Sequence, residues 1–270
     1  MNVEIINTGN ELLNGKIKNT NVDWLIKKLH KLGANLIQYS VIPDDLDVIV
    51  FTLHAALERS AEVIITTGGL GATYDDMTLK AVAQVVNRPL FLNEQALEMV
   101  ESKFEYAKRL GWTKANQITD HWRKMAVLPE GSTPINNPPG AAPGVKTEYQ
   151  GKTIFSLPGP PNELQAIFRT AISPFLKEKI KHKPPEAHFY IDGVIEPTIS
   201  GIIEETFNNF KGVWIKSHPM LHTGKLMLEI HLTLEDGYYS TELLENAKSY
   251  FIESIRKFGC GRILTELEVK

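Results

Sequence analysis

Residues 66–76, TTGGLGATYDD, combine the residue types that can bind a phosphate group. They follow an apolar run at residues 63–65, which predicts a buried strand. Glycines at the end of a strand let a phosphate approach the backbone, and the N–H groups of a following helix attract anions. Asp75 and Asp76 would then either cap that helix or hold a divalent cation against the phosphate. This stretch alone is consistent with a capped turn and with a phosphate site.

Two other predicted strands end in polar or acidic residues. Glu11 follows the first strand in TGNELLNG, and Asp44 follows the second in VIPDD. Ligands of an open parallel sheet bind beyond the carboxyl ends of its strands, so these acids would share one edge with Asp76. Carboxylates that hold divalent ions can neutralise bridging phosphates and activate a water molecule. We interpret the three strand ends together as a site.

Strands and helices alternate over the first part of the chain, with apolar residues at strand or helix spacing. This alternation predicts a mostly parallel sheet covered on both faces, that is, a three-layer α/β/α domain over residues 1–180. A polar, helical segment is expected at residues 93–124 and a strand-and-turn stretch at 125–160. The other predicted elements are strands at 3–6, 35–42 and 62–67 and helices at 22–32, 48–57, 76–86 and 161–180.

A second unit is predicted after residues 177–185, KEKIKHKPP, whose lysines and double proline are typical of a linker. The pattern that follows is β-α-β-β-α-β, which predicts a small two-layer α+β sandwich over residues 186–270. Its predicted strands are 188–194, 213–217, 225–234 and 262–267, and its predicted helices are 197–209 and 239–258.

Composition and charge exclude several classes of protein. The 270 residues carry a formal net charge of −3, which gives no electrostatic reason to expect nucleic-acid binding. Cys260 is the single cysteine, so an intrachain disulfide and a cysteine-based zinc site are excluded. No apolar run reaches membrane-spanning length, and the first residues lack a signal-peptide pattern. We expect a cytoplasmic protein that binds neither a membrane nor a nucleic acid.

Four motifs together resemble a known family. They are TGNELLNGKIKNTN (8–21), TTGGLGATYDDMT (66–78), NPPGAAPG (137–144) and LPGPPNEL (157–164). In this order they resemble the N-terminal domain of CinA (competence/damage-inducible) proteins, a member of the molybdopterin-binding superfamily. Residues 186–270 resemble the KH-type domain that follows it. Ala72 replaces the usual proline of the loop, and no counterpart of the C-terminal amidohydrolase domain is seen, so no deamidase activity is expected.

The resemblance implies an activity and a set of residues. CinA-type domains that this one resembles hydrolyse ADP-ribose to AMP and ribose 5-phosphate with a divalent metal (Mg²⁺, Mn²⁺ or Co²⁺). By motif, catalysis and metal binding would fall to Glu11, Asp44 and Asp76. The residues expected to contact the substrate or its phosphates in these motifs are Thr8, Gly9, Asn21, Thr67, Gly68, Gly69, Gly71, Pro158 and Gly159.

Other candidates have two possible roles. Arg123 and Lys124 lie before Val127-Leu128-Pro129 and are either phosphate ligands or a solvated helix end. The PGPP stretch at residues 158–161 either walls the ligand or only begins a helix, since proline is favoured there. Asn162 and Glu163 are expected to cap that helix.

Three functions remain open from the sequence. The first is metal-dependent hydrolysis of ADP-ribose or a related nucleotide diphosphate. The second is binding of molybdopterin, with adenylyl transfer. The third is a non-catalytic, regulatory module that binds a nucleotide. The resemblance also implies a homodimer.

Overall fold

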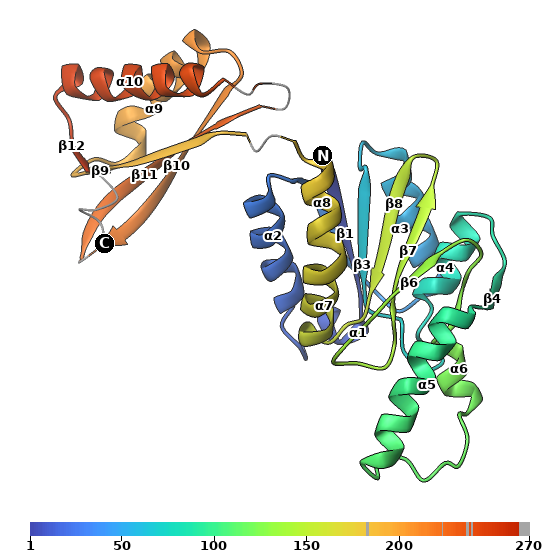
Figure 1. Ribbon diagram of the computed structural model, residues 1–270. Coiled ribbons are helices and arrows are strands. Elements are labelled where there is room, and N and C mark those ends of the chain that lie inside the picture. Colours follow the sequence, from blue (N-terminus) through green and yellow to red (C-terminus); the bar gives the residue numbers. More distant parts are fainter. Residues whose placement is uncertain (182–183, 223, 236–237, 239, 265–270) are drawn as a thin grey trace. The chain divides into compact units, whose positions relative to one another are not determined.

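Figure 1 shows the computed structural model of the chain, which describes residues 1–181, 184–222, 224–235, 238 and 240–264. The chain divides into two compact units, Met1–Lys181 and His182–Lys270. Within the described residues, no helix combines the length and the apolar composition that crossing a membrane requires.

The first unit is built around a six-stranded, mostly parallel sheet with the strand order β2-β1-β3-β8-β7-β6. Strands β2, β1, β3 and β8 are parallel, and β7 is antiparallel to both of its neighbours. The strands are β1 (Asn2–Thr8), β2 (Asn35–Ile42), β3 (Val63–Thr67), β6 (Thr133–Ile135), β7 (Gly144–Tyr149) and β8 (Lys152–Leu157). The carboxyl ends of the four parallel strands therefore meet at one edge.

Helices cover both faces of this sheet, as Figure 1 shows. Val3 and Ile5 of β1 pack in one buried cluster with α2, α7 and α8, whereas Ile6 packs on the other face with α3 and α4. The alternation follows from the two-residue repeat of a strand. These helices are α2 (Thr20–Leu32), α3 (Leu46–Glu58), α4 (Thr78–Val85), α7 (Pro161–Ile167) and α8 (Ser173–Lys179). The predicted three-layer α/β/α fold is confirmed.

The first unit has further elements besides these layers. The predicted helical segment at 93–124 is interrupted, because Gly111, with a φ of +72°, ends the first helix in a left-handed turn. The Gly111 N–H donates to the Lys108 carbonyl oxygen at 3.0 Å, which closes that turn. These elements are α1 (Asn10–Leu13), β4 (Leu90–Leu92), α5 (Glu94–Arg109), α6 (Asp120–Lys124) and β5 (Val127–Pro129), and a π-helical segment (Phe168–Ile172) joins α7 to α8.

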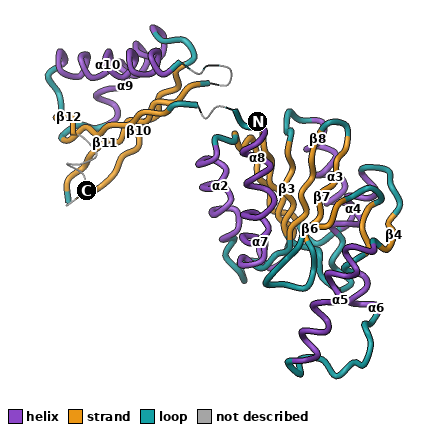
Figure 2. Tube along the Cα trace, in the orientation of Figure 1, coloured by secondary structure: helices purple, strands orange, loops and turns teal. Residues whose placement is uncertain are grey.

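The second unit is an antiparallel four-stranded sheet with the order β10-β11-β9-β12. Figure 2 shows its two helices on the same side of the sheet, where they share one buried core. Its elements are β9 (Glu186–Asp192), α9 (Glu196–Asn209), β10 (Val213–His222), β11 (Lys225–Leu234), α10 (Thr241–Phe258) and β12 (Arg262–Leu264). The predicted α+β class is confirmed.

Several boundaries in the second unit differ from the prediction. β10 continues beyond residue 217 to His222, because it pairs along its full length with β11. α10 begins at Thr241, since the Ser240 hydroxyl accepts a hydrogen bond from the Leu243 N–H at 3.1 Å and caps the helix. The start predicted at residue 239 and the strand predicted at residues 265–267 lie outside the described residues.

An ion pair joins β1 to the end of α3, and its acidic partner is buried while the Arg59 side chain is partly exposed. Glu4, in the middle of β1, is completely buried. Arg59, directly after α3, donates from Nε to Glu4 Oε2 at 2.9 Å and from Nη2 to Oε1 at 2.5 Å. A carboxylate at this depth is tolerated only while its partner remains in place.

We therefore expect Arg59→Met to lower the free energy of unfolding by roughly 3 kcal/mol, because it leaves the Glu4 carboxylate buried without a partner. The double variant Glu4→Leu/Arg59→Met should recover most of that loss, since no charge is then buried. Urea unfolding of the three proteins measures both effects. A single variant as stable as the wild type would contradict this account of the pair.

Candidate functional site

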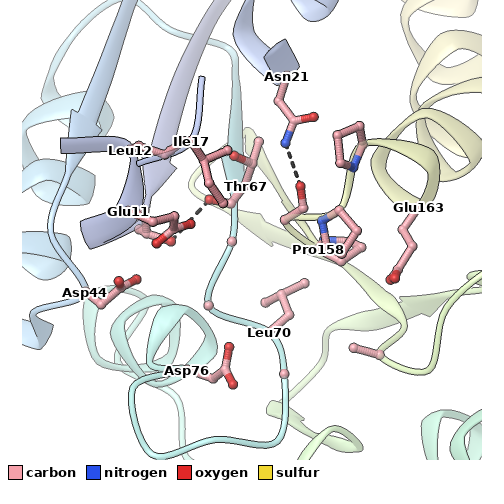
Figure 3. Close-up of a pocket in the computed structure, with 18 of the residues that line it drawn as sticks. Glu11, Leu12, Ile17, Asn21, Asp44, Thr67, Leu70, Asp76, Pro158 and Glu163 are labelled. Atoms are coloured by element: carbon pink, nitrogen blue, oxygen red, sulfur yellow. Dashed lines mark hydrogen bonds between the residues drawn. The ribbon is translucent and has the colours of Figure 1, made fainter. Parts of the chain in front are cut away.

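A pocket of about 570 Å³ opens where the parallel strands end (Figure 3). This volume falls in the range of pockets that bind small molecules. Eleven of the residues proposed from the sequence line it: Thr8, Glu11, Asn21, Asp44, Thr67, Gly68, Gly69, Gly71, Asp76, Pro158 and Gly159. They come from the ends of β1, β2, β3 and β8 and from the start of α2, so the sheet topology brings together segments that are far apart in the sequence.

Three predicted residues do not line this pocket: Gly9, Arg123 and Lys124. Arg123 is exposed on α6. Lys124 donates from Nζ to the Thr73 carbonyl oxygen and lines a smaller neighbouring cleft, which Gly69, Leu70 and Gly71 also line. Gly9 instead makes room for a pocket residue, because a Cβ atom there would lie 2.6 Å from Glu11 Oε1.

The last residue of β3 and the loop that follows it, residues 67–71, have a backbone that strongly favours glycine at two positions. Gly68 and Gly69 have φ angles of +94° and +69°. A Cβ atom on Gly68 would lie 2.4 Å from the Thr8 carbonyl oxygen, and one on Gly69 would lie 2.3 Å from Thr78 Oγ1. We call residues 67–71 the glycine loop.

Three amide groups of the glycine loop are left free for a ligand. The Gly68 N–H donates to the Leu157 carbonyl oxygen at 2.9 Å. Within the described residues, the N–H groups of Gly69, Leu70 and Gly71 donate to no protein acceptor, and all three residues line the pocket. Successive free amides of this kind form a binding site for an anion such as a phosphate.

Thr78, the first residue of α4, holds the glycine loop in place. Its Oγ1 donates to the Gly68 carbonyl oxygen at 2.8 Å, and its N–H donates to that of Gly69 at 3.1 Å. The helix therefore begins at Thr78 rather than at Asp76, and the alternative in which Asp75 and Asp76 cap it is wrong, because Met77 occupies the cap position.

Asp76 belongs to a tight turn before α4. Its Oδ2 accepts hydrogen bonds from the Thr73 N–H at 2.8 Å and from Thr73 Oγ1 at 2.6 Å. A Cβ atom on Gly71 would lie 2.7 Å from the same Oδ2, so this glycine also makes room for a carboxylate. The turn directs the acid to the glycine loop instead of to the helix.

The acids at this end of the pocket influence each other. Burial raises the pKa of Asp44, a hydrogen bond from the Asn10 N–H opposes that rise, and the charges of Glu11, Asp75 and Asp76 add to it. The Asn10 N–H lies 2.8 Å from Asp44 Oδ2. The Thr73 hydroxyl is the main cause that lowers the pKa of Asp75. Such a concentration of negative charge attracts a cation.

A metal site of three protein carboxylates is not formed in this arrangement. Among the described residues, no group of three or more His, Cys, Asp or Glu side chains is placed so that it could hold a metal ion. Mg²⁺ commonly binds through one or two carboxylates and completes its shell with water and substrate phosphates. A site of that second kind would use only one or two of Glu11, Asp44 and Asp76, so the described part of the chain does not form the metal site of three acids that the motifs imply.

Sequence reasoning missed the place of Glu163. We expected it to cap α7, but that helix has no side-chain cap, and Pro160 occupies the cap position. Glu163 instead lines the pocket, and its Oε2 accepts a hydrogen bond from Asn137 Nδ2 at 2.7 Å. The NPPG motif that contains Asn137 was the only sequence feature pointing to this contact, and it does not indicate that Glu163 is the partner.

The fold and the pocket define an α/β protein whose glycine loop is suited to a small anionic ligand. Residues 4–178 match the family described as the probable molybdopterin binding domain, and the chain belongs to this family. The predicted membership of the superfamily is thereby confirmed.

Two relatives and one solved structure extend this result. The chain is 37% identical over 263 residues to a protein of Pyrobaculum aerophilum, covering 94% of this chain and 95% of that one. It is 37% identical over 231 residues to a protein of Sulfurisphaera tokodaii, covering 85% of this chain and 84% of that one. The crystal structure of CinA from Thermoplasma acidophilum, a protein of unknown function, is 34% identical with a TM-score of 0.57 and covers 65% of this chain and 99% of its own. The chain is thus a relative of CinA.

Replacing Gly68 by alanine tests the approach of the glycine loop to β1. We expect Gly68→Ala to destabilise the protein by more than the roughly 1–2 kcal/mol that a left-handed alanine costs, because its methyl group would also collide with the Thr8 carbonyl oxygen. Gly151→Ala is the matched control, since Gly151 has a φ of +76° and nothing within 4 Å of an added Cβ atom. Equal losses in urea unfolding would show that the close approach is not required.

The raised pKa of Asp44 predicts a pH dependence of stability. The pKa of Asp44 is higher in the folded protein than the ordinary value of 3.8. The protein therefore becomes less stable as the pH rises above 3.8, because the folded state disfavours the ionised carboxylate. Asp44→Asn, which keeps an acceptor for the Asn10 N–H, should therefore gain stability relative to wild type between acidic and neutral pH.

Urea unfolding at pH values from 3 to 7 measures this difference. Asp45→Asn is the control, because Asp45 caps α3 through the Val48 N–H and asparagine caps equally well. A difference between Asp44→Asn and wild type that stays constant with pH would contradict the prediction.

Proposed function

We propose that the first unit binds a nucleotide diphosphate and hydrolyses it with a divalent metal, and that ADP-ribose is the substrate, giving AMP and ribose 5-phosphate. The observation that carries the proposal is one pocket lined both by three residues with free amides, Gly69, Leu70 and Gly71, and by acids. Amides suit the phosphates, and acids suit a cation that neutralises them.

The residues divide the work of hydrolysis in this proposal. The glycine loop holds the diphosphate, and one or two of Asp44, Asp76 and Glu11 would hold the metal, which would supply charge neutralisation and an activated water. The water oxygen forms a bond to one phosphorus, and the bridging oxygen leaves with the other phosphate. The proton of the water would pass to a carboxylate of this set that does not bind the metal, and Asp44 suits that role because burial raises its pKa and makes it a stronger base.

The family match supports a second candidate function. A domain of the molybdopterin-binding family could use the same glycine loop for the phosphate of a pterin, followed by adenylyl transfer. Tight binding of a pterin without release of AMP from any nucleotide would favour this candidate over hydrolysis.

Incubation with ADP-ribose, FAD, NAD and ATP, each with Mg²⁺, Mn²⁺ or Co²⁺, tests the hydrolase. We expect AMP from ADP-ribose, and we expect Asp76→Asn to lower that rate by at least about 100-fold. Asparagine retains an oxygen for the two Thr73 donors, so the turn should remain folded while the charge is lost.

Asp75→Asn is the matched control for Asp76→Asn. Asp75 accepts a hydrogen bond from the same Thr73 hydroxyl and also lines the pocket, but the proposal gives it no contact with the metal or the substrate, so its rate should fall far less than that of Asp76→Asn. Thermal unfolding would check that both variants fold. Release of no AMP from any of the four nucleotides would exclude the hydrolase, and an active Asp76→Asn variant would remove Asp76 from the mechanism.

A further inference from the structure

Asn137 is a buried side chain whose hydrogen-bonding groups are all engaged. It is 3% exposed, and its Nδ2 donates to the Ala142 carbonyl oxygen and to Glu163 Oε2, both at 2.7 Å. Its Oδ1 accepts a hydrogen bond from the Gly140 N–H at 3.2 Å. The amide cannot be turned over, because its oxygen would then face two acceptors. Asn137 therefore presents a donor to Glu163.

Gly140 makes the remaining space for the Glu163 carboxylate. A Cβ atom on Gly140 would lie 2.0 Å from Glu163 Oε2, so any larger residue would displace the carboxylate. The NPPG motif thus supplies a donor at its first position and a gap at its last. Together they hold one oxygen of Glu163 at the wall of the pocket.

The other carboxylate oxygen of Glu163 is free for a ligand. Within the described residues, Oε1 has no protein donor, and the side chain is only half-buried. Figure 3 shows Glu163 across the pocket from Glu11 and Asp44, next to the turn at Pro158. It is therefore separate from the acids that the proposed function assigns to the metal.

We propose that Glu163 is a specificity-determining residue that accepts hydrogen bonds from the hydroxyl groups of a ribose. This inference rests on the proposed function, because it concerns the part of the nucleotide diphosphate that extends beyond the glycine loop. An ionised carboxylate only accepts hydrogen bonds, so it repels phosphate and selects a donor. A ribose adjoins each phosphate of ADP-ribose, and its hydroxyls are the donors nearest to the diphosphate.

Glu163→Gln reverses the hydrogen bonding at this position with little change of shape. Because Asn137 presents a donor, the glutamine oxygen must face Asn137, and the glutamine NH₂ group then faces the ligand. The variant therefore offers ribose a donor where the wild type offers a charged acceptor.

The test is calorimetric titration of the full chain with ADP-ribose and with inorganic pyrophosphate, which has no ribose. Mg²⁺ is present, and Asp76→Asn is the background in order to suppress turnover. We expect Glu163→Gln to raise the Kd for ADP-ribose by about 10-fold or more, as for the loss of a hydrogen bond to a charged group, and to leave the Kd for pyrophosphate within about twofold. Glu98→Gln, at an exposed position of α5, should change neither value.

Each other outcome is decisive. An unchanged Kd for ADP-ribose in Glu163→Gln would overturn the inference. A protein with Glu163 intact that binds pyrophosphate but not ADP-ribose would overturn it as well. Equal loss of both ligands would also overturn it, because Glu163 would then support the pocket as a whole. The expected loss of ADP-ribose affinity, together with no release of AMP by the wild-type chain, would support the inference and exclude only the hydrolysis.

Discussion

The glycine loop passes so close to the end of β1 that the neighbouring backbone leaves no room for a side chain at Gly68. A methyl group there would lie 2.4 Å from the Thr8 carbonyl oxygen. This contact places the loop over the central strands, and Thr78 fixes it from the other side through the Gly68 carbonyl oxygen. The free amides and the nearby acids depend on this position, because a loop displaced from β1 would no longer face Glu11 and Asp44.

The pocket that results has two chemically different sides. The glycine loop and the acids after β1 and β2 suit a diphosphate with its cation, whereas Glu163, held by Asn137, suits a neutral group that donates hydrogen bonds. Glycines occur at both sides for the same physical reason. Gly71 and Gly140 each leave the space that a neighbouring carboxylate occupies. A phosphate linked to a sugar matches both sides, which connects the proposed function to the proposed role of Glu163.

Much of the fold could be predicted from the sequence, because the apolar periodicity of a strand or helix is a local property. For example, the positions of Val3, Ile5 and Ile6 along β1 indicate that both faces of this strand are buried, and no knowledge of the residues packed against them is needed. The details of the site depend on contacts between distant residues. Asp76 resembled the start of α4 until the turn with Thr73 and the contact of Thr78 with Gly68 were seen. Glu163 resembled a cap because its partner, Asn137, lies 26 residues earlier in the chain.

The central claim is that the glycine loop binds the phosphates of the ligand, and a crystal structure of the protein with bound ADP-ribose tests it most directly. We predict phosphate oxygens about 2.7–3.2 Å from the amide nitrogens of Gly69, Leu70 and Gly71. A structure in which ADP-ribose is bound with its diphosphate elsewhere, and with these amides facing water, would contradict the account.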